Sequence, residues 1–192
     1  QAYVDYVKAL EISFVSIIAR FGLDTVISPD IKMLSNFPSM DPKEYNDALC
    51  RGEIPDEISS FIVVPSSFDP SVAPEGSQLV MMTTAVPADI DPAHCPAILE
   101  ALIDVAEGHF PGLREHVAFV EKVLPGDAAR VMGEDGAGIG IAQQAGQAGK
   151  DRPAIKTPLE GLYIVGAEAG GAGVGTELAV NSAIEFFEDH VA

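Results

Sequence analysis

A glycine-rich stretch near the end of the chain constrains the fold more than any other segment. Four of the six residues from 170 to 175 are glycine. The run Leu162–Val165 before them is short, apolar and rich in β-forming residues, which predicts a buried strand. After them, apolar residues recur at helical spacing, at Val180, Ile184, Phe187 and Val191. Residues 159–183 therefore predict a strand, a tight glycine loop and a helix.

The start of this helix is suited to an electron-rich ligand. Thr176 is predicted to be its N-cap, and Glu177 places a carboxylate in its first turn. Glycine lets a backbone turn sharply and approach a ligand closely, and the N–H groups of a helix N-terminus face that ligand. A plain glycine turn between a last strand and a last helix is the alternative. We favour a ligand because four glycines are more than a turn needs.

Two common nucleotide motifs do not fit the loop. A P-loop has the spacing from Gly170 to Gly175 but requires a lysine next, where Thr176 stands. A G-x-G-x-x-G fingerprint from Gly171 and Gly173 would also need a small residue at 176 and a following βαβ unit. The loop alone does not predict a nucleotide-binding domain.

Composition excludes several classes of function. The net charge is −18 and the isoelectric point is about 4.3, which argues against nucleic acid and against electrostatic binding to anionic membranes. No apolar run reaches the 18 residues of a membrane span, and no signal-peptide pattern is seen. Two cysteines, Cys50 and Cys95, suit a reducing compartment without a disulfide framework. We expect a cytoplasmic protein.

Side chains that could perform catalysis or bind a metal are scarce. The four histidines are scattered without metal-ligand spacing, so no metal site is predicted: His94, His109, His116 and His190. No serine lies in a G-x-S-x-G elbow, and no catalytic residue is assigned. The one basic cluster is Lys150, Arg152 and Lys156, for which a solvated loop is favoured over a phosphate contact.

The rest of the chain predicts a mixture of strands and helices. Strands are expected at 10–19, 25–28, 58–65, 79–86 and 117–124, and the third and fourth should pair as a hairpin. Asp41-Pro42 and Asp91-Pro92 each predict an N-cap followed by proline, opening helices that end at Leu49 and Gly108. Further helices are expected at 1–8, 127–132 and 141–148, with a glycine loop over 133–140. Met81 and Met82 should face opposite sides of their strand.

The run from Pro158 to Thr176, with Gly166, Glu168 and the loop Gly-Gly-Ala-Gly-Val-Gly, resembles the C-terminal flavin motif of the phytoene desaturase/retinol saturase family. These are FAD-dependent, amine-oxidase-like oxidoreductases. The block of two strands around residues 58–86 resembles the substrate domain of that family. The resemblance implies that Gly166 and Glu168 contact the ribityl and phosphate part of FAD. It further implies that Gly173, Val174, Gly175 and Thr176 meet the pyrimidine side of the isoalloxazine, and that Gly171 also belongs to the cofactor-binding loop.

The resemblance also implies a fold and an activity. The fold class is α+β or α/β, with an antiparallel or mixed sheet and helices in a substrate domain over residues 1–125. The C-terminal strand, loop and helix of a Rossmann-like FAD domain follow over residues 126–192. The activity is a desaturase, saturase or dehydrogenase reaction on a small apolar substrate, isoprenoid or carotenoid-like. FAD would perform the redox chemistry while the protein supplies position and electrostatics.

The family carries its G-x-G-x-x-G fingerprint near the N-terminus, which this chain, starting at Gln1, lacks. We therefore expect a C-terminal portion of a longer flavoprotein that is inactive alone and binds FAD weakly or not at all. Without its N-terminal dinucleotide-binding half it should expose part of Leu162–Val165 and the Val180, Ile184 and Phe187 stripe, and associate as a homo-oligomer. The parent would have peripheral membrane contact at most. The alternative is a non-catalytic protein-interaction module whose glycine loop is only structural.

Overall fold

The computed structural model describes residues 1–132 and 140–191. The chain divides into two compact units, one formed by Val15–Gly136 and the other by Gln1–Phe14 together with Ala137–Ala192. We call the first the sheet unit and the second the glycine-loop unit. The bounds differ from the predicted 1–125 and 126–192, because the first fourteen residues fold with the C-terminal segment. The roles of substrate domain and FAD domain stay predictions.

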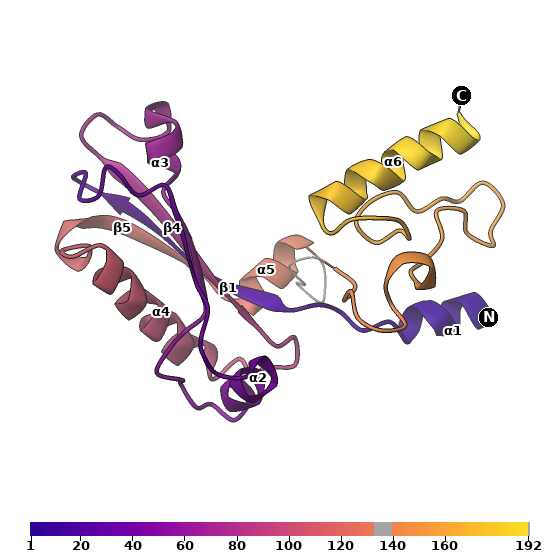
Figure 1. Cartoon of the computed structure of the whole chain (residues 1–192), viewed down its shortest axis with the longest axis horizontal. Helices are drawn as coiled ribbons and strands as arrows, with labels where there is room; N and C mark the ends of the chain where they lie inside the picture. The colour runs from indigo at the N-terminus through magenta and orange to yellow at the C-terminus, as the bar shows by residue number, and fades with distance from the viewer. Residues whose placement is uncertain (133–139, 192) are drawn as a thin grey trace. The chain divides into compact units, whose positions relative to one another are not determined.

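A five-stranded antiparallel sheet forms the centre of the sheet unit (Figure 1). Its strands are β1 (Val15–Leu23), β2 (Met33–Asn36), β3 (Ser60–Val63), β4 (Gln78–Val86) and β5 (Val117–Val123), in the order β2-β3-β4-β1-β5. The predicted pairing of the strands at 58–65 and 79–86 is confirmed, with Phe61 opposite Thr83. Of the two predicted sheet types, antiparallel and mixed, the structure shows the antiparallel one.

One face of the sheet carries the hydrophobic core. Side chains alternate between faces, so Ile17, Ala19 and Phe21 of β1 and Val80 and Met82 of β4 are buried together. Helix α4 (Cys95–His109) covers this face (Figure 1) and contributes the fully buried side chains Ile98, Leu102 and Ala106. Burial of each such leucine or isoleucine contributes about 1.5–3 kcal/mol. Met82 faces this core while Met81 faces the other side, as the alternation predicts.

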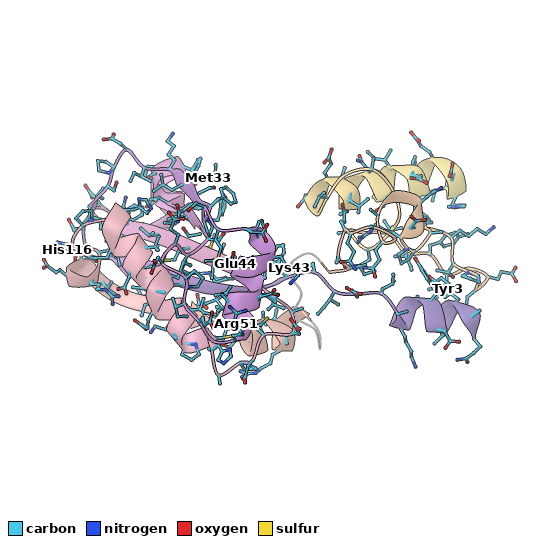
Figure 2. The ribbon with its side chains drawn as sticks, turned by 60° about the horizontal axis from the view of Figure 1, so that its bottom comes forward. Tyr3, Met33, Lys43, Glu44, Arg51 and His116 are labelled. Carbon is cyan, nitrogen blue, oxygen red and sulfur yellow. The ribbon has the colours of Figure 1, made fainter. Side chains whose placement is uncertain are left out.

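Helix α2 (Pro42–Cys50) begins as its sequence predicts. The Asp41 carboxylate accepts hydrogen bonds from the backbone N–H groups of Lys43 (3.0 Å) and Glu44 (3.2 Å), and Pro42 occupies the first turn. Figure 2 shows Lys43 and Glu44 in this turn. Tyr45 and Leu49 point into the core, and the Tyr45 hydroxyl accepts a hydrogen bond from the Ser59 N–H.

Three boundaries in the sheet unit differ from prediction. β1 begins at Val15 rather than residue 10 and continues through Gly22 and Leu23, which pair with β4. Residues 25–28 form no strand, because the buried Gln78 side chain accepts from the N–H groups of Ile27 and Ser28 in place of a neighbouring strand. α4 begins at Cys95, since the Asp91 carboxylate accepts from the N–H of Ala93 and closes a separate turn first.

The remaining elements of the sheet unit are short. They are α3 (Pro65–Phe68), the 3-10 helices η1 (Pro70–Val72) and η2 (Arg114–His116), and α5 (Pro125–Met132). Gly108 lies inside α4, which ends one residue later than predicted. α3 packs on β4, and α5 packs on β1.

The glycine-loop unit contains α1 (Ala2–Lys8), η3 (Gly149–Asp151) and α6 (Thr176–His190). Figure 2 labels Tyr3 on α1. One turn later in this helix, the Tyr6 hydroxyl donates a hydrogen bond to the Asp151 carbonyl at 2.8 Å. Gln147 forms two hydrogen bonds with the backbone of Glu11, accepting from its N–H (2.8 Å) and donating to its carbonyl (3.1 Å). Two segments 136 residues apart in sequence are thus joined.

The prediction of a helix at 141–148 is wrong. The carbonyls of Ile141, Ala142 and Gln147, which would accept helical hydrogen bonds, accept instead from the Arg152 side chain. Seven residues of the predicted glycine loop at 133–140 lie outside the described residues. In this unit the described residues form only isolated bridges, Ile12 with Ile141 and Lys156 with Tyr163. Its Rossmann-like character stays a prediction.

None of the helices in the described ranges has both the length and the apolar character required to cross a bilayer.

Candidate functional site

The run before the glycine loop is not the buried strand that its sequence predicts. Residues 162–165 make one bridge, between Tyr163 and Lys156, and Leu162 and Val165 are 50% and 45% exposed. The N–H of Ile164 donates to the Ile155 carbonyl at 2.8 Å. The β-forming composition therefore yields an extended segment, because among the described residues only the short piece around Ile155 pairs with it.

The glycine loop adopts backbone conformations that other residues avoid. Gly166, Gly171, Gly173 and Gly175 all have positive φ, of 144°, 150°, 105° and 56°. The need is clearest at Gly173, where a Cβ would lie 3.0 Å from the Leu178 backbone nitrogen and 2.8 Å from Glu177 Cγ. The loop thus passes directly over the first turn of α6, as close as a chain without side chains allows.

The N-terminus of α6 has no side-chain cap. Gly175 is the N-cap residue, and Thr176, predicted as the cap, is instead the first helical residue. The first N–H groups of a helix have no partner within it, and here the N-cap residue is a glycine without a side chain to accept from one. Glu177 lies in the first turn as predicted. Val174, beside these N–H groups, is 54% exposed.

Two amide side chains hold carbonyl oxygens of the loop. Asn181 Nδ2 donates to the Ala172 carbonyl at 2.9 Å, and Gln143 Nε2 donates to the Gly173 carbonyl at 3.0 Å. Two oxygens of the loop are thus occupied by protein donors, while the N-cap residue Gly175 makes no side-chain bond to the N–H groups at the helix start. The loop therefore offers hydrogen-bond donors to an electron-rich group.

Ser182 connects α6 to the start of the loop. It is fully buried, its Oγ accepts from the Gly166 N–H at 2.8 Å, and its hydroxyl donates toward the Ala179 carbonyl (2.9 Å) or the Gly166 carbonyl (3.1 Å). Ser182 lies one turn after Leu178, the other buried residue of the helix. These two residues fix the loop against α6.

Glu168, the predicted acidic contact of the cofactor, forms contacts inside its own unit. Its Oε2 accepts from the Ile141 N–H at 2.9 Å and lies 3.8 Å from Arg152 Nη2. A Cβ at Gly140 would overlap its Oε1, so Gly140 must be a glycine for the carboxylate to lie there. The side chain is 43% exposed, and its contact with a cofactor stays a prediction.

Arg152 is the main departure from the predicted basic cluster. Lys150 and Lys156 are exposed, but the Arg152 side chain is 1% exposed rather than solvated. Nη1 lies within 3.1–3.4 Å of the carbonyls of Ile141, Ala142 and Gln147, and Nη2 donates to the Ala167 carbonyl at 2.6 Å. One guanidinium thus joins the segment at 141–147 to the loop.

A cavity of about 480 Å³ lies beside this loop within the same unit. Its lining combines loop glycines with charged and apolar residues, including Gly170, Gly171, Lys150, Glu185 and Ile155. Gly170 lies close to Gly149, another residue of the lining, since a Cβ added at position 170 would be 3.1 Å from the Gly149 carbonyl oxygen.

The apolar stripe of α6 faces solvent, as predicted. Val180, Ile184, Phe187 and Val191 are between 51% and 59% exposed. The opposite stripe packs within the unit: Phe186 and His190 contact the Tyr163 ring at centroid distances of 5.0 and 4.8 Å. The helix therefore has two apolar sides, of which one is covered by the described residues.

No group of histidine, cysteine and carboxylate side chains in the described ranges could hold a metal ion. His116 pairs with Asp24 at 3.0 Å on the surface of the sheet unit. Burial raises the pKa of the Cys95 thiol, and burial together with Asp89 raises that of Cys50. Neither thiol is poised as a nucleophile at neutral pH.

Comparison with known proteins places the chain beside oxidoreductases. It is 31% identical, over 159 residues, to a 4,4'-diapolycopen-4-al dehydrogenase of Metabacillus indicus, covering 79% of this chain and 32% of the relative. A crystal structure of an oxidoreductase from Methanosarcina mazei has the same fold over 98% of the chain and 37% of its own length, with 21% identity and a TM-score of 0.59. No family model matches the sequence. The chain spans about a third of the length of the proteins it matches.

Proposed function

We propose that this chain forms part of an FAD-dependent oxidoreductase whose cofactor binds at the glycine loop. The observation that carries the proposal is the start of α6, where a loop of positive-φ glycines meets uncapped helical N–H groups. The similarity to a carotenoid-pathway dehydrogenase and to the fold of a second oxidoreductase supports it.

The residues of the loop fit a flavin. Reduced flavin carries negative charge near N1 and C2=O, and a helix N-terminus stabilises such charge by about 0.3–1 kcal/mol, or more where the site is partly buried. The backbones of Gly173, Val174, Gly175 and Thr176 would supply the N–H groups. Because Gly166 and Gly175 have nothing within 4 Å of a Cβ position, ligand atoms would find room where side chains would stand.

The open face of the sheet is the surface we assign to an apolar substrate. Register places Met33, Val63 and Met81 in one row of that face, and Phe61 in the next row. Met33 is 55% and Phe61 41% exposed. Methionine and aromatic side chains adapt to flexible apolar molecules, which agrees with an isoprenoid or carotenoid-like substrate. FAD supplies the hydride transfer when bound; the protein residues orient the substrate and exclude water.

We further propose that the parent protein contains an N-terminal dinucleotide-binding half and acts in the cytoplasm. The 192-residue chain alone would bind FAD weakly or not at all, because that half would hold the adenosine and pyrophosphate of the cofactor. Any contact of the parent with membranes would be peripheral and made to reach an apolar substrate.

A protein-interaction module is the second candidate. The exposed stripe of α6 favours it, because an apolar row of this size is typical of a surface that binds another chain. In that case the glycine loop would only turn the backbone into α6. The visible absorption spectrum of the protein separates the two candidates.

The test is the spectrum of the native full-length protein after gel filtration. Flavin bands that disappear in Gly173→Val and Gly175→Val would support FAD at the loop. Gly146→Val is the matched control, since Gly146 also has positive φ (82°) but has nothing within 4 Å and lies outside the loop. A folded, colourless protein that takes up no added FAD would contradict the proposal and favour the interaction module.

A further inference from the structure

The burial of Arg152 is costly for stability, which points to a role beyond packing. A guanidinium that leaves water requires compensation from nearby acceptors. The nearest carboxylate, of Glu168, is 3.8 Å from Nη2 and is shared with the Ile141 N–H. The buried Nε has no partner in the part of the chain that the structure describes. An apolar side chain of similar volume would satisfy packing with less desolvation.

Arg152 contacts one peptide of the loop, the one between Ala167 and Glu168, and this contact bears on the orientation of that peptide. Nη2 donates to the Ala167 carbonyl at 2.6 Å, the shortest of its contacts. A trans peptide is planar, and its C=O and N–H point in opposite directions. With the Ala167 oxygen turned toward Arg152, the N–H of Glu168 is turned away from it. Without the cation this peptide could rotate and direct its carbonyl outward.

We propose that Arg152 is the positioning residue of the cofactor loop. Its guanidinium holds the Ala167 carbonyl inward, so that this peptide presents the Glu168 N–H, rather than an acceptor oxygen, to an electron-rich group. Ser182 holds the peptide between Val165 and Gly166 through the Gly166 N–H, so the two side chains fix peptides that lie two positions apart in the same loop. The identity of the ligand, FAD, rests on the proposed function. The role of Arg152 in orienting the loop peptide does not depend on it.

Arginine suits this position because several acceptors surround it. Four carbonyl oxygens, of Ile141, Ala142, Gln147 and Ala167, lie within 3.4 Å of its two terminal nitrogens. A guanidinium carries five N–H donors in a planar fork, whereas a lysine ammonium carries three on a flexible stem. A lysine could keep the charge but not hold both segments at once.

The experiment uses the native full-length protein and two readouts. Hydrogen exchange of the peptides covering 166–175 reports loop order without any cofactor, and titration with FAD reports affinity. Arg152→Met should speed exchange in these peptides and weaken FAD binding about 10- to 100-fold, the range for a lost charge-assisted hydrogen bond. Arg152→Lys should recover part of the affinity, and the visible circular dichroism of its bound flavin should differ from wild type.

Lys156→Met is the matched control, because it removes an exposed positive charge four residues away and should change neither readout. If Arg152→Met does not fold, the exchange rates, FAD affinity and flavin dichroism of Arg152→Lys alone test the inference. Wild-type affinity, flavin dichroism and exchange in the folded Arg152 variants would overturn the inference while leaving the proposed function intact. If the wild-type protein takes up no FAD, the proposed function fails, and the exchange rates alone then confirm or reject the positioning role.

Discussion

The hydroxyl of Ser182, in the second turn of α6, accepts the N–H of Gly166 at 2.8 Å, sixteen residues earlier in the chain. The same hydroxyl lies 3.1 Å from the Gly166 carbonyl, so Ser182 contacts both backbone polar groups of the first glycine of the loop. Since Ser182 is fully buried, water cannot replace it there. The bond ties the conformation of the loop to the folding of the helix.

Replacement of Ser182 by alanine should therefore loosen the loop. Loss of a buried partner costs about 1–3 kcal/mol, whereas the higher helix propensity of alanine returns at most about 0.7 kcal/mol. We expect a net loss in the free energy of unfolding and faster hydrogen exchange at the Gly166 amide. Ser35→Ala, on the exposed side of β2, is the control and should change stability by less than about 0.5 kcal/mol. Equal exchange rates at Gly166 in Ser182→Ala and wild type would refute the prediction.

Gly22 and Phe119 should show strong energetic coupling. They face each other across β1 and β5, and a methyl group on Gly22 would overlap the Phe119 ring. Gly22→Ala should destabilise the protein by roughly 1 kcal/mol, because the ring must leave its packed position. In a Phe119→Ala background the same change should be neutral or stabilising, since alanine is better than glycine in a strand by about 0.5–1 kcal/mol. Additive effects in a double-mutant cycle followed by urea unfolding would contradict this.

Glu107 should make stability depend on pH in the acidic range. Its carboxylate accepts from the N–H groups of Gly112 (2.8 Å) and Arg114 (2.9 Å), and these bonds hold its pKa below the ordinary value of 4.5. A lowered pKa in the folded state means that the unfolded state binds more protons. The contribution of Glu107 is therefore present above pH 4.5 and is lost as pH falls through the lowered pKa.

Thermal unfolding across this pH range tests the prediction. Glu107→Gln should lower the Tm near neutral pH, and its difference from wild type should shrink as pH falls below about 4.5. Glu115→Gln removes an exposed charge from the same turn and serves as the control. A Tm difference for Glu107→Gln that stays constant down to the acid transition would show that the two hydrogen bonds do not favour the ionised form.

The exposed stripe of α6 should drive self-association of the 192-residue chain. Ile184→Glu should shift sedimentation toward the monomer, because it places a charge at the centre of the stripe. Val131→Glu is the matched control, since Val131 is 87% exposed on α5. The net charge of −18 opposes association, so the wild-type oligomer should strengthen as salt rises and screens this repulsion. A wild-type chain that is monomeric at high concentration and high salt would exclude the interface.

Local patterns were sufficient to predict most of the sheet unit. The alternation in Leu79–Val86 and the Asp41-Pro42 signal each describe a relationship between neighbouring residues, and both are found in the structure. The errors arise where a distant side chain replaces a backbone partner. Gln78 binds the N–H groups of residues 27 and 28, and no local pattern reveals a partner fifty residues away.

The sequence predicted where the candidate site lies, but not which side chains hold its loop in place. The glycines of the loop are visible in the sequence because positive φ requires them. Arg152 and Ser182 are not, because a polar residue between Asp151 and Pro153, or one on a helix, ordinarily faces water. The composition of Leu162–Val165 likewise predicted a strand, although a strand also needs a neighbour, and sequence does not say whether one is present.

The hydrogen bonds between Glu11 and Gln147 have a consequence for the order of folding. During synthesis the first fourteen residues emerge long before the segment that they bind, and all of Val15–Gly136 is made in between. The sheet unit can fold as soon as β5 has emerged, whereas the N-terminal segment must wait unpaired. Once folded, the sheet unit holds α5 against β1, which shortens the loop between Glu11 and Gln147 and reduces the entropy lost when these two segments pair. Assembly of the glycine-loop unit thus follows folding of the sheet unit.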